Sequence, residues 1–526
     1  MKRSAFGNFV FILLFVLMLA GEALTVATVI RLDMLPPLYL GAMIGFFAIL
    51  TLLIAFLLFV KGKRSGKGRR VIACVLMLLL LCGCAVITTV ATDVMNTLQA
   101  TNEAEPAKTT REVYVLAENE AESLAQTGNF TYGFIKNFEQ TCVDQVLAEV
   151  QEQTGADVAT AGYTNLYTMV NALLNNQIDA MILNGGYVSI LEETPEYADF
   201  SAKTRILAQV EVDEPEEVLN PAADSILQEE MGEVEEVEVN TEPIEVDLTE
   251  ELTDFSNLKP FVLYISGSDT YGDQIVKTGR SDVNILAVIN PMTKQVLLLN
   301  TPRDYYVQNT AGGGARDKLT HCGIYGMKCS MNTLGNLYNT DIEYYVRINF
   351  DGFKKLIDAM GGVTIYSDYA FTAITRTEIK EGINELTGQQ ALDFARERYT
   401  LKGGDNDRGK HQMQVIKALI QKATSGTTII TNYSDIMASV DGMFQMNVPT
   451  ELISDMMKMQ LSDMAQWNVV TYAATGSFAA AECYSMPGME LSVIKPSSSS
   501  VSKAQRLIDM VFAGELLTEE VVNSIT

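Results

Sequence analysis

The sequence predicts an α/β protein that stands outside a membrane on three helices. Three apolar segments open the chain, at residues 6–30, 38–60 and 71–90. After them, short apolar strands alternate with amphipathic helical patterns, most regularly between residues 258 and 423. The chain has 526 residues and a formal net charge of −27, and its acidic excess lies after residue 100.

Residues 1–92 are predicted to be three transmembrane helices, because each apolar segment is close to the ~20 residues that cross a hydrocarbon core of ~30 Å. The intervening loop 61–70 (KGKRSGKGRR) carries six Lys or Arg residues. Positively charged loops stay in the cytoplasm, so the amino terminus is expected inside and the chain after the third span outside. The first segment is too long for a removed signal peptide and lacks a small-residue cleavage site.

The seven cysteines leave one question open. Cys82 and Cys84 resemble a lipoprotein cleavage box, but the apolar run continues past them and favours an ordinary membrane helix. Cys322 and Cys329 lie in a turn-rich stretch (HCGIYGMKC) and would form either a local disulfide or two free thiols. A zinc site is not expected, because no second Cys or His pair has ligand spacing.

Residues 105–210 are predicted to form a small extracellular α/β accessory domain. One phrase in it, LLNNQIDAMILNGGY, resembles a lobe of an extracytoplasmic solute-binding protein, but no catalytic constellation is visible. Packing, substrate contact and docking of envelope-assembly proteins remain open as its role. Residues 211–257 are strongly acidic and are expected to be an extended linker, with cation or partner binding as the alternative. In the accessory domain, strands are expected at Val113–Leu116 and Ala180–Leu183, and helices are expected at Phe138–Val150 and Leu166–Leu174.

Residues 258–526 form the largest predicted domain, an α/β sandwich with a largely buried sheet. Strands are expected at Pro260–Ser266, Val283–Asn290, Gln295–Asn300, Trp467–Ala473 and Ser492–Pro496, the last two completing the sheet. Helices are expected at Phe350–Met360, Gly388–Arg398 and Lys410–Ala423, and a final helix should pack on the sheet.

Two aspartates flank neighbouring strands of this domain. Asp269 follows the first strand, and Asp282 precedes the second. Pairing of the two strands would bring both carboxylates to one end of the sheet, where they would suit Mg²⁺ or Mn²⁺. Gly-Ser-Asp is also common turn chemistry, which is the structural alternative.

Four arginines lie at predicted strand or helix ends. Arg303 follows a strand, and Arg396, Arg398 and Arg408 lie in ALDFARERYTLKGGDNDRGKHQ. Guanidinium groups bind phosphate bidentately and remain charged, so their convergence would indicate a pyrophosphate site. The alternative is that the arginines pair with the nearby acids Glu397, Asp405 and Asp407, each pair contributing ~0–1 kcal/mol.

The acidic chain repels nucleic-acid phosphates, so DNA or RNA is not an expected partner.

The ordered motifs GSDTYG, GRSDVNILAVINP, LLLNTPRDYYV, DIEYYVRINFDGF and LTGQQALDFARERYTLKGGDNDRGKHQ resemble the LytR-CpsA-Psr family. The similarity runs from about residue 258 through at least 423, and the three spans with an extra extracellular domain resemble capsule-associated members. The resemblance implies an αβα-sandwich catalytic domain with a groove for a polyprenyl chain. It also implies a phosphotransferase that joins teichoic acid, capsular polysaccharide or a related glycan to peptidoglycan.

The resemblance also assigns site residues. The family's metal-binding acids match Asp269 and Asp282, and its glutamine matches Gln412. Asp405 matches the acid before the last arginine motif. The chain departs from the family pattern at Cys322 and at His411, where an arginine often stands. The pyrophosphate-binding arginines match Arg280, Arg303, Arg396, Arg398 and Arg408.

The mechanism that follows is a hypothesis. With Mg²⁺ on the aspartates, the arginines hold the pyrophosphate of the lipid-linked glycan while a peptidoglycan hydroxyl attacks. Arg303, Arg396 and Arg398 are the expected catalytic arginines. Asp405 is either the general base for that hydroxyl or the group that orients a neighbouring arginine. His321 is interpreted as structural.

Two other activities remain open for the same residues. Water in place of the acceptor would make the protein a pyrophosphatase. A carrier-binding scaffold or envelope regulator would keep the arginines but would not need the metal pair, so metal dependence distinguishes it. A DNA-binding regulator is disfavoured, because the arginines lie outside the cell.

Overall fold

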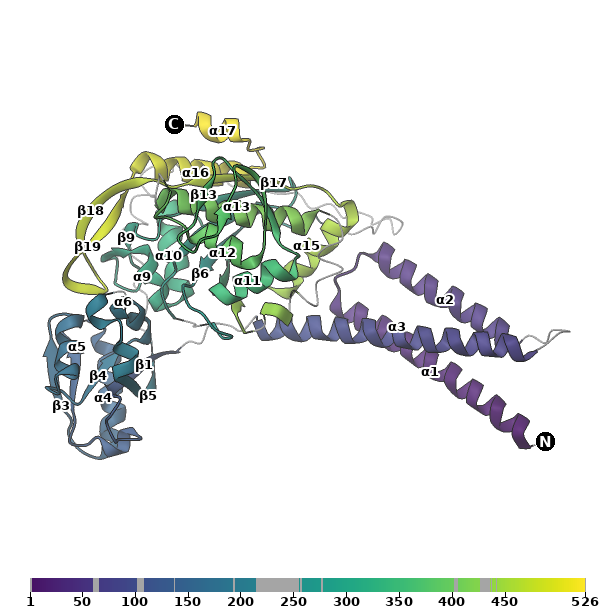
Figure 1. The fold of residues 1–526 in the computed structure, drawn as a ribbon, viewed down its shortest axis with the longest axis horizontal. Coiled ribbons are helices and arrows are strands. Elements are labelled where there is room, and N and C mark those ends of the chain that lie inside the picture. Colours follow the sequence, from purple (N-terminus) through teal and green to yellow (C-terminus); the bar gives the residue numbers. More distant parts are fainter. Residues whose placement is uncertain are drawn as a thin grey trace, which may run out of the picture.

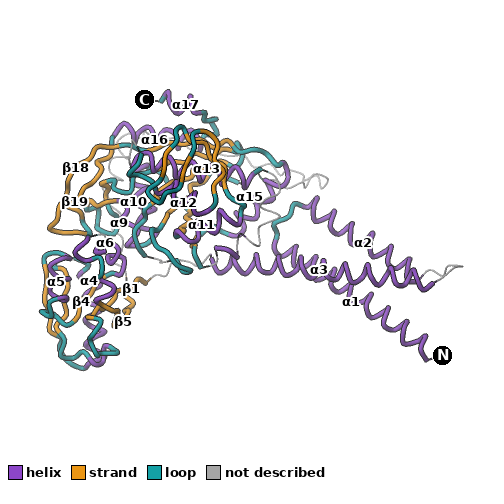
Figure 2. The backbone as a smooth tube through the Cα atoms, viewed as in Figure 1, coloured by secondary structure: helices purple, strands orange, loops and turns teal. Residues whose placement is uncertain are grey.

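The computed structural model describes residues 2–59, 66–101, 108–136, 138–192, 194–213, 255, 258–275, 278–401, 405–425, 436, 438–440 and 442–525. Figure 1 shows three parts: a set of long helices near the amino terminus, a central α/β body and a smaller α/β unit beside it. Figure 2 separates the all-helical part from the two parts that contain strands.

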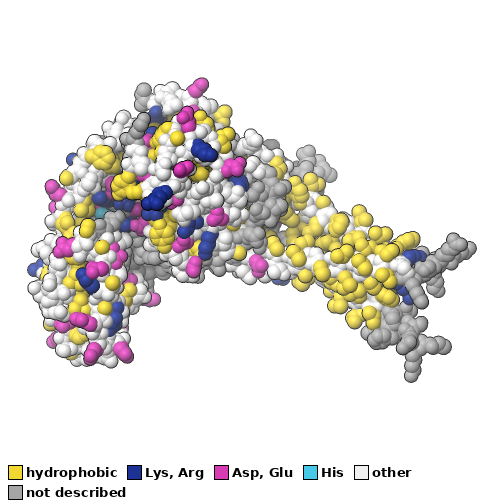
Figure 3. Space-filling view, in the orientation of Figure 1, with side chains coloured by type: hydrophobic (Ala, Val, Ile, Leu, Met, Phe, Trp, Pro, Cys, Tyr) yellow, Lys and Arg dark blue, Asp and Glu magenta, His cyan; other side chains and the backbone are white. Residues whose placement is uncertain are grey.

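The amino-terminal part consists of α1 (Lys2–Leu32), α2 (Pro37–Phe59) and α3 (Gly66–Thr101). Each contains a stretch long and apolar enough to cross a membrane, which confirms three apolar helices near the predicted positions. Their apolar side chains cover the surface of this part, as Figure 3 shows in yellow. Such a surface requires a lipid environment rather than water.

The small unit, residues 108–213, is called the accessory unit below. Its five-stranded sheet has the order β3-β2-β4-β1-β5. One face carries α4, whose Val146 and Val150 are fully buried, and the other face carries α5 with Met169. The element bounds are β1 Lys108–Leu116, β2 Thr131–Ile135, α4 Gln140–Thr154, β3 Ala159–Tyr163, α5 Leu166–Leu174, β4 Ala180–Leu183, α6 Val188–Glu192, α7 Phe200–Lys203 and β5 Thr204–Asp213.

The central body is built on a mixed six-stranded sheet with the order β16-β11-β6-β7-β8-β17. β11 lies parallel to β6 and β17 lies parallel to β8, whereas β6, β7 and β8 are antiparallel neighbours. The strand bounds are β6 Phe261–Gly267, β7 Val283–Asn290, β8 Gln295–Asn300, β11 Tyr344–Ile348, β16 Phe444–Met446 and β17 Asn468–Ala473.

Helices cover both faces of this sheet, which confirms the predicted α/β sandwich. On one face, α10 (Met327–Tyr338) and α16 (Ser498–Phe512) bury a core that contains Leu297. On the other, α13 (Asp405–Thr424) and α15 (Thr450–Asp463) bury Leu298. Because adjacent side chains of a strand point to opposite faces, the continuous apolar run in β8 supplies both cores.

The remaining elements surround this sandwich. α11 and α12 pack beside α13, and the antiparallel pair of strands β12 and β15 lies against them. Their bounds, with those of the other elements, are β9 Tyr306–Gln308, β10 Arg316–Lys318, α9 Leu319–Cys322, α11 Phe350–Ala359, β12 Val363–Ser367, β13 Phe371–Thr372, β14 Glu378–Ile379, β15 Gly382–Leu386, α12 Gly388–Arg396, β18 Gly476–Cys483, β19 Met486–Pro496 and α17 Glu519–Ser524.

Two sequence-based expectations were wrong in this body. Ser492–Pro496 does not complete the central sheet but belongs to β19, which pairs with β18 in a separate two-stranded hairpin. The stretch around Cys322 and Cys329 is helical rather than turn-rich, because α9 and α10 flank a single 3₁₀ turn at Gly323–Tyr325. No disulfide joins the two cysteines, and their buried thiol groups lie beside Thr333 and Asn309, respectively.

The body is fastened to the membrane helices at the turn between α1 and α2. The Lys458 ammonium lies 2.7 Å from the Asp33 carboxylate, and the Ser454 hydroxyl donates to the Asp33 carbonyl. Met34 of the same turn and Val94 of α3 join a buried apolar cluster with Met446 of β16. The sheet therefore meets the membrane part at a fixed place.

Asp317 of β10 is a buried carboxylate that joins three segments. It lies 2.8 Å from His321 Nδ1, and it accepts the backbone N–H groups of Ser485 at 3.1 Å and Lys318 at 2.8 Å. Burial opposes ionisation, but His321 and these hydrogen bonds outweigh it and hold the pKa of Asp317 below its ordinary value.

Asp317→Asn should destabilise the full chain at pH 7 by about 1–3 kcal/mol, the cost of weakening a buried, hydrogen-bonded charge. A carboxyl group whose pKa is lower in the folded state stabilises the folded protein above its unfolded pKa of about 3.9, and this contribution is lost as the pH falls through the folded-state pKa. In thermal unfolding in detergent, the difference in melting temperature between the wild type and Asp317→Asn should therefore be complete at pH 5–7 and smaller below pH 4. Asp509→Asn, on an exposed position of α16, is the control. A gap independent of pH would contradict this role for the charge.

Candidate functional site

The candidate site is built at the end of the sheet where β6 finishes and β7 begins. β6 and β7 are antiparallel with Gly267 opposite Val283, and the Asp282 N–H donates to the Gly267 carbonyl at 2.8 Å. Asp269 follows β6 and Asp282 precedes β7, so the two carboxylates lie at the same end of the sheet. This is the arrangement that the sequence predicts.

Each aspartate is paired with a predicted arginine. Arg280 donates to Asp269, and Arg303 Nη1 donates to Asp282 Oδ2 at 2.6 Å. The other oxygen of Asp282 accepts the Thr320 hydroxyl at 3.1 Å. Thr320 was missed in the sequence, because nothing local links residue 320 to residue 282.

The two carboxylates differ in their electrostatics. Burial and the charge of Asp282 raise the pKa of Asp269. Burial also acts on Asp282, but Arg303, Arg280 and Arg408 outweigh it and lower the pKa of this carboxyl. Burial and the neighbouring carboxylate therefore act against ionisation of Asp269, whereas the arginines favour the ionised form of Asp282.

The donor set fits a hard divalent cation. Mg²⁺ commonly uses one or two carboxylates and completes its shell with water and phosphate oxygens, and Asp269 and Asp282 supply two. Among the described residues, no group of three or more His, Cys, Asp or Glu side chains could hold a metal. A cation here would therefore depend on ligand oxygens as well as on the protein.

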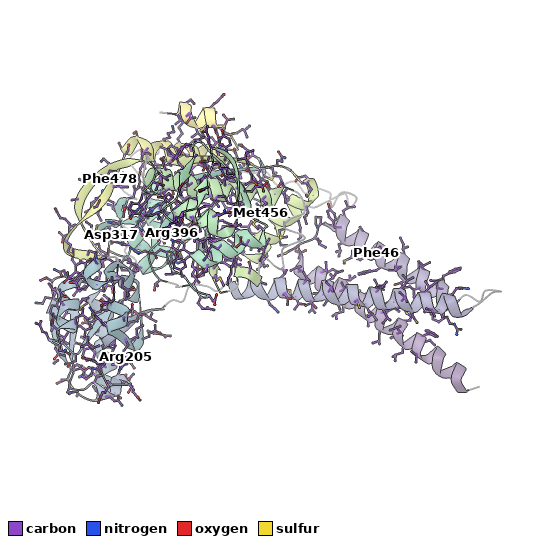
Figure 4. The ribbon with its side chains drawn as sticks, in the orientation of Figure 1. Phe46, Arg205, Asp317, Arg396, Met456 and Phe478 are labelled. Atoms are coloured by element: carbon purple, nitrogen blue, oxygen red, sulfur yellow. The ribbon has the colours of Figure 1, made fainter. Side chains whose placement is uncertain are left out.

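Two further arginines are held by aromatic rings. Arg396 ends α12, its Nη1 donates to the Tyr271 hydroxyl at 2.7 Å, and its Cζ lies 4.3 Å from the centre of the Phe350 ring. Arg398 stacks on Tyr399 with its Cζ 4.6 Å from the ring centre. Aromatic contacts orient a guanidinium without neutralising it, so both cations remain available to an anion. Figure 4 labels Arg396 in the central body.

Glu397 stabilises the turn between these arginines rather than pairing with them. Its carboxylate accepts the backbone N–H groups of Ile374, Arg398, Tyr399 and Thr400 at 2.6–3.0 Å. Burial acts against ionisation, but these donors outweigh it and lower the pKa of Glu397. Another of the acids considered in the sequence, Asp407, pairs with Lys410 at 3.2 Å.

Helix α13 supplies the last predicted side chains. It begins at Asp405, so Arg408 lies within the helix and not before it, which corrects the predicted boundary. Asp405 itself starts the helix, but its side chain lies outside the described ones. His411 is buried, stacks on Phe394 with ring centres 4.0 Å apart and donates from Nδ1 to the Phe394 carbonyl at 3.2 Å, so it has a structural role.

A cavity of about 460 Å³ joins these groups to an apolar chamber. Its polar end contains seven predicted residues, and Arg280 lies behind it on Asp269. Its apolar walls come from β6, β11, α11, α12 and α13. The predicted polar lining residues are Asp269, Asp282, Arg303, Arg396, Arg398, Arg408 and Gln412; the apolar ones include Leu263, Ile265, Val346, Ile348, Phe353, Leu356, Leu392, Ile416 and Leu419.

A sequence model of the LytR_cpsA_psr family matches residues 225–497, more than half of the chain. The chain belongs to the LytR_cpsA_psr family. The match includes every residue proposed for the site. It also begins before residue 258, within the segment that was predicted to be a linker.

Two relatives of this LytR_cpsA_psr chain share one name. It is 36% identical over 204 residues to the "polyisoprenyl-teichoic acid–peptidoglycan teichoic acid transferase TagU" of Enterococcus faecalis, covering 39% of this chain and 65% of the relative. It is 35% identical over 203 residues to the protein of the same name from Bacillus cereus, covering 38% and 64%. The chain thus spans slightly less than two thirds of each relative.

Solved structures of the same group are also similar to it. B. subtilis TagV is 24% identical with a TM-score of 0.41 and covers 49% of this chain and 99% of its own. B. subtilis TagU is 23% identical with a TM-score of 0.38 and covers 50% and 100%.

The fully buried Arg347 is a residue of the site that sequence analysis missed. Its guanidinium donates to the carbonyls of Gly279 at 2.9 Å and Arg280 at 3.3 Å and to the Ser281 hydroxyl at 3.1 Å. These contacts fix the loop that carries Arg280 and precedes Asp282. An arginine inside the strand YYVRI was the available signal, because a charge in a buried strand needs a specific partner.

Arg303→Gln should weaken binding of inorganic pyrophosphate tenfold to a hundredfold, because one charge-assisted contact contributes about 1.5–3 kcal/mol. It also leaves Asp282 without its 2.6 Å partner, which adds repulsion of the ligand. Isothermal titration calorimetry on the full chain would measure the affinity. Arg316→Gln is the matched control, because Arg316 is an exposed arginine stacked on Tyr306. Equal affinities of Arg303→Gln and the control would exclude Arg303 from the anion site.

Leu356→Gln should weaken ligand binding at the apolar end of the cavity and leave binding at the polar end unchanged. Leu356 lies on the cavity wall contributed by α11. Affinity for a short prenyl pyrophosphate should fall about tenfold, the effect of losing one apolar side chain from a contact, while affinity for inorganic pyrophosphate should stay unchanged. Leu516→Gln, at a position 62% exposed, is the control. Parallel losses for both ligands would indicate a general folding defect.

Proposed function

We propose that this chain transfers a phosphoglycan from a polyprenyl-pyrophosphate carrier to a peptidoglycan hydroxyl and forms a phosphodiester. The observation that carries the proposal is the cavity, whose arginine-lined end is continuous with an apolar chamber. A lipid pyrophosphate has the same division, with an anionic head and a hydrocarbon tail. The name of the E. faecalis and B. cereus relatives, a polyisoprenyl-teichoic acid–peptidoglycan teichoic acid transferase, supports this class of substrate.

The walls of the chamber follow from strand alternation. Leu263 and Ile265 on β6 and Val346 and Ile348 on β11 are half-buried, whereas the residues between them are fully buried on the opposite face. Half-buried aliphatic side chains in central strands leave apolar surface uncovered. Binding of a hydrocarbon chain would remove that surface from water, at about 25 cal/mol per Å².

The attachment of the body to the membrane helices supports a membrane-borne substrate. Leu263 and Val346 line the cavity and also pack in the cluster that contains Met34 and Val94. The apolar wall of the cavity is thus continuous with the ends of α1 and α3. A carrier chain could pass from the bilayer to the cavity along apolar surface.

In the proposed reaction, the acceptor hydroxyl oxygen forms a bond to the phosphorus that carries the glycan. The bond from that phosphorus to the bridging oxygen breaks, and the electron pair leaves with polyprenyl phosphate. Arg303, Arg396, Arg398 and Arg408 stabilise the charge on the phosphate oxygens, and Arg280 and Gln412 support this cluster. Asp405 would accept the hydroxyl proton or else orient Arg398 or Arg408.

Asp269 and Asp282 are the residues that would hold Mg²⁺ or Mn²⁺. The cation would neutralise charge on the pyrophosphate.

We propose that the chain crosses the membrane three times with the loop 61–70 in the cytoplasm, because that loop holds six Lys or Arg residues. The accessory unit and the body then lie outside, where the peptidoglycan acceptor is found. The glycan is teichoic acid, capsular polysaccharide or a related phosphoglycan.

Arg396→Ala should lower the transfer rate at least about a hundredfold, as removal of a transition-state donor does, without lowering the melting temperature. The full chain in detergent is mixed with polyprenyl-pyrophosphate-linked glycan and peptidoglycan oligomers, and products are followed by mass spectrometry. Arg506→Ala, an exposed arginine on α16, is the matched control. Transfer retained by Arg396→Ala would refute this assignment.

The same assay separates the proposed reaction from its alternatives. Product that forms with Mg²⁺ and not with chelator supports the metal-dependent transferase. Free glycan phosphate without a peptidoglycan adduct would identify a pyrophosphatase. Tight binding of the lipid without any product would instead identify a carrier-binding scaffold.

A further inference from the structure

The accessory unit contacts the body at Leu319–Tyr325, which is called the bridging segment below, and at the β18–β19 hairpin around Tyr484 and Met486. The Tyr187 and Tyr325 hydroxyls are 2.5 Å apart, and the Asn184 amide donates to the Ile324 carbonyl at 3.2 Å. Ile324 is fully buried within a cluster formed mainly by accessory-unit residues. The carboxyl-terminal end of the bridging segment is thus part of the core of the accessory unit.

Close packing fixes this contact. A Cβ atom on Gly186 would lie 2.8 Å from Ile324 Cγ2, so the backbone of the accessory unit touches the Ile324 side chain directly. Around it, Phe138 and Tyr325 each contact Tyr484, with ring centres 5.3 Å and 6.0 Å apart. An interface of buried aromatic and apolar groups resists hinge motion, unlike the polar surfaces between mobile domains.

The other end of the bridging segment forms part of the candidate site. Thr320 donates its backbone N–H to the Arg303 carbonyl at 2.8 Å and its hydroxyl to Asp282 at 3.1 Å. The Thr320 carbonyl accepts the Ser281 N–H at 3.1 Å. Thr320 therefore touches both members of the Asp282–Arg303 ion pair.

The bridging segment also packs without a gap against the loop before Asp282. The Gly279 N–H donates to the Gly323 carbonyl at 3.0 Å, and a Cβ atom on Gly323 would lie 2.5 Å from the Gly279 carbonyl oxygen. Only three residues separate Thr320, at the site, from Ile324, in the accessory-unit core. Such a short helical connection transmits displacement, because packed elements move as units and not by continuous deformation.

We propose that the accessory unit sets the geometry of the site through the bridging segment, with Thr320 as the positioning residue for Asp282 and Arg303. The accessory unit is then a control module for the site rather than a passive spacer. Coupling of this kind is reciprocal, so occupation of the anion site should also stabilise the contact between Tyr187 and Tyr325. The structural part of this proposal does not need the transferase activity, whereas its kinetic consequence rests on the proposed function.

Hydrogen exchange on the full chain tests the structural part. Tyr187→Phe removes one hydroxyl at the contact, and Tyr132→Phe is the matched control because the Tyr132 hydroxyl lies 2.5 Å from Thr127 within the accessory unit. Exchange of the Gly279 and Ser281 amides should accelerate about fivefold in Tyr187→Phe, the effect of one lost buried hydrogen bond, and should not change in Tyr132→Phe. Inorganic pyrophosphate should slow exchange in peptides covering 184–187 of the wild type. Unchanged Gly279 and Ser281 exchange in Tyr187→Phe, or equal acceleration in both variants, would overturn the coupling.

Substitution of Thr320 tests the positioning role. Thr320→Val keeps the shape and removes the hydroxyl, and Thr320→Ser keeps the hydroxyl. The kcat for transfer should fall about tenfold in Thr320→Val, the effect of losing a hydrogen bond to a charged group, while KM for the lipid carrier stays unchanged because the chamber walls are intact. Thr320→Ser should restore kcat. A normal kcat in Thr320→Val, or a loss not rescued by serine, would overturn this role. Absence of transfer in the wild type would refute the proposed function, and the exchange experiment would still decide the coupling.

Discussion

The antiparallel pairing of β6 with β7 is the constraint on which the rest of the structure depends. It places the residues after one strand beside those before the next, and so brings two carboxylates together in a buried corner. Neither could stay ionised there without cations, and Arg280 and Arg303 supply them. Burying these charges costs free energy, which explains why so many hydrogen bonds hold the loop that precedes Asp282. Arg347, Thr320 and the Gly323 carbonyl all hold the segment between the two aspartates.

Alternation along β6 and β11 divides the body into two functional faces. Leu263, Ile265 and Val346 face the cavity, while Tyr264 and Arg347 face the opposite core. The same five-residue stretch of each strand therefore supplies both the apolar wall for a ligand and the support for the loop above it. A one-residue shift of register would exchange these faces and destroy the cavity and the loop support together.

The sequence best predicted those features of the structure that depend on residues close together in the chain. The bounds of β7 and β8 agreed with prediction because apolar runs flanked by turns define such strands without distant contacts. Seven polar residues of the cavity were predicted from motifs, which record the chemistry of each local segment. Thr320, Tyr271 and the β18–β19 hairpin were not, since each depends on a partner far away in the chain. The side chain of Asp405 and most of the residues predicted as a linker lie outside the described residues.

The site is held between two fixed attachments, and this arrangement bears on how a membrane-borne ligand could be used. On one side, Asp33 and Met34 fasten the body to the membrane helices; on the other, Ile324 joins it to the accessory unit. A lipid ligand has its tail confined to the bilayer, so the reach of its head group is limited. For the proposed lipid pyrophosphate, a fixed distance between the arginines and the membrane helices would hold the head group near the site, which would lower the entropic cost of reaction. Because the contact is rigid, a displacement of the accessory unit should also displace Asp282, as the proposed coupling requires.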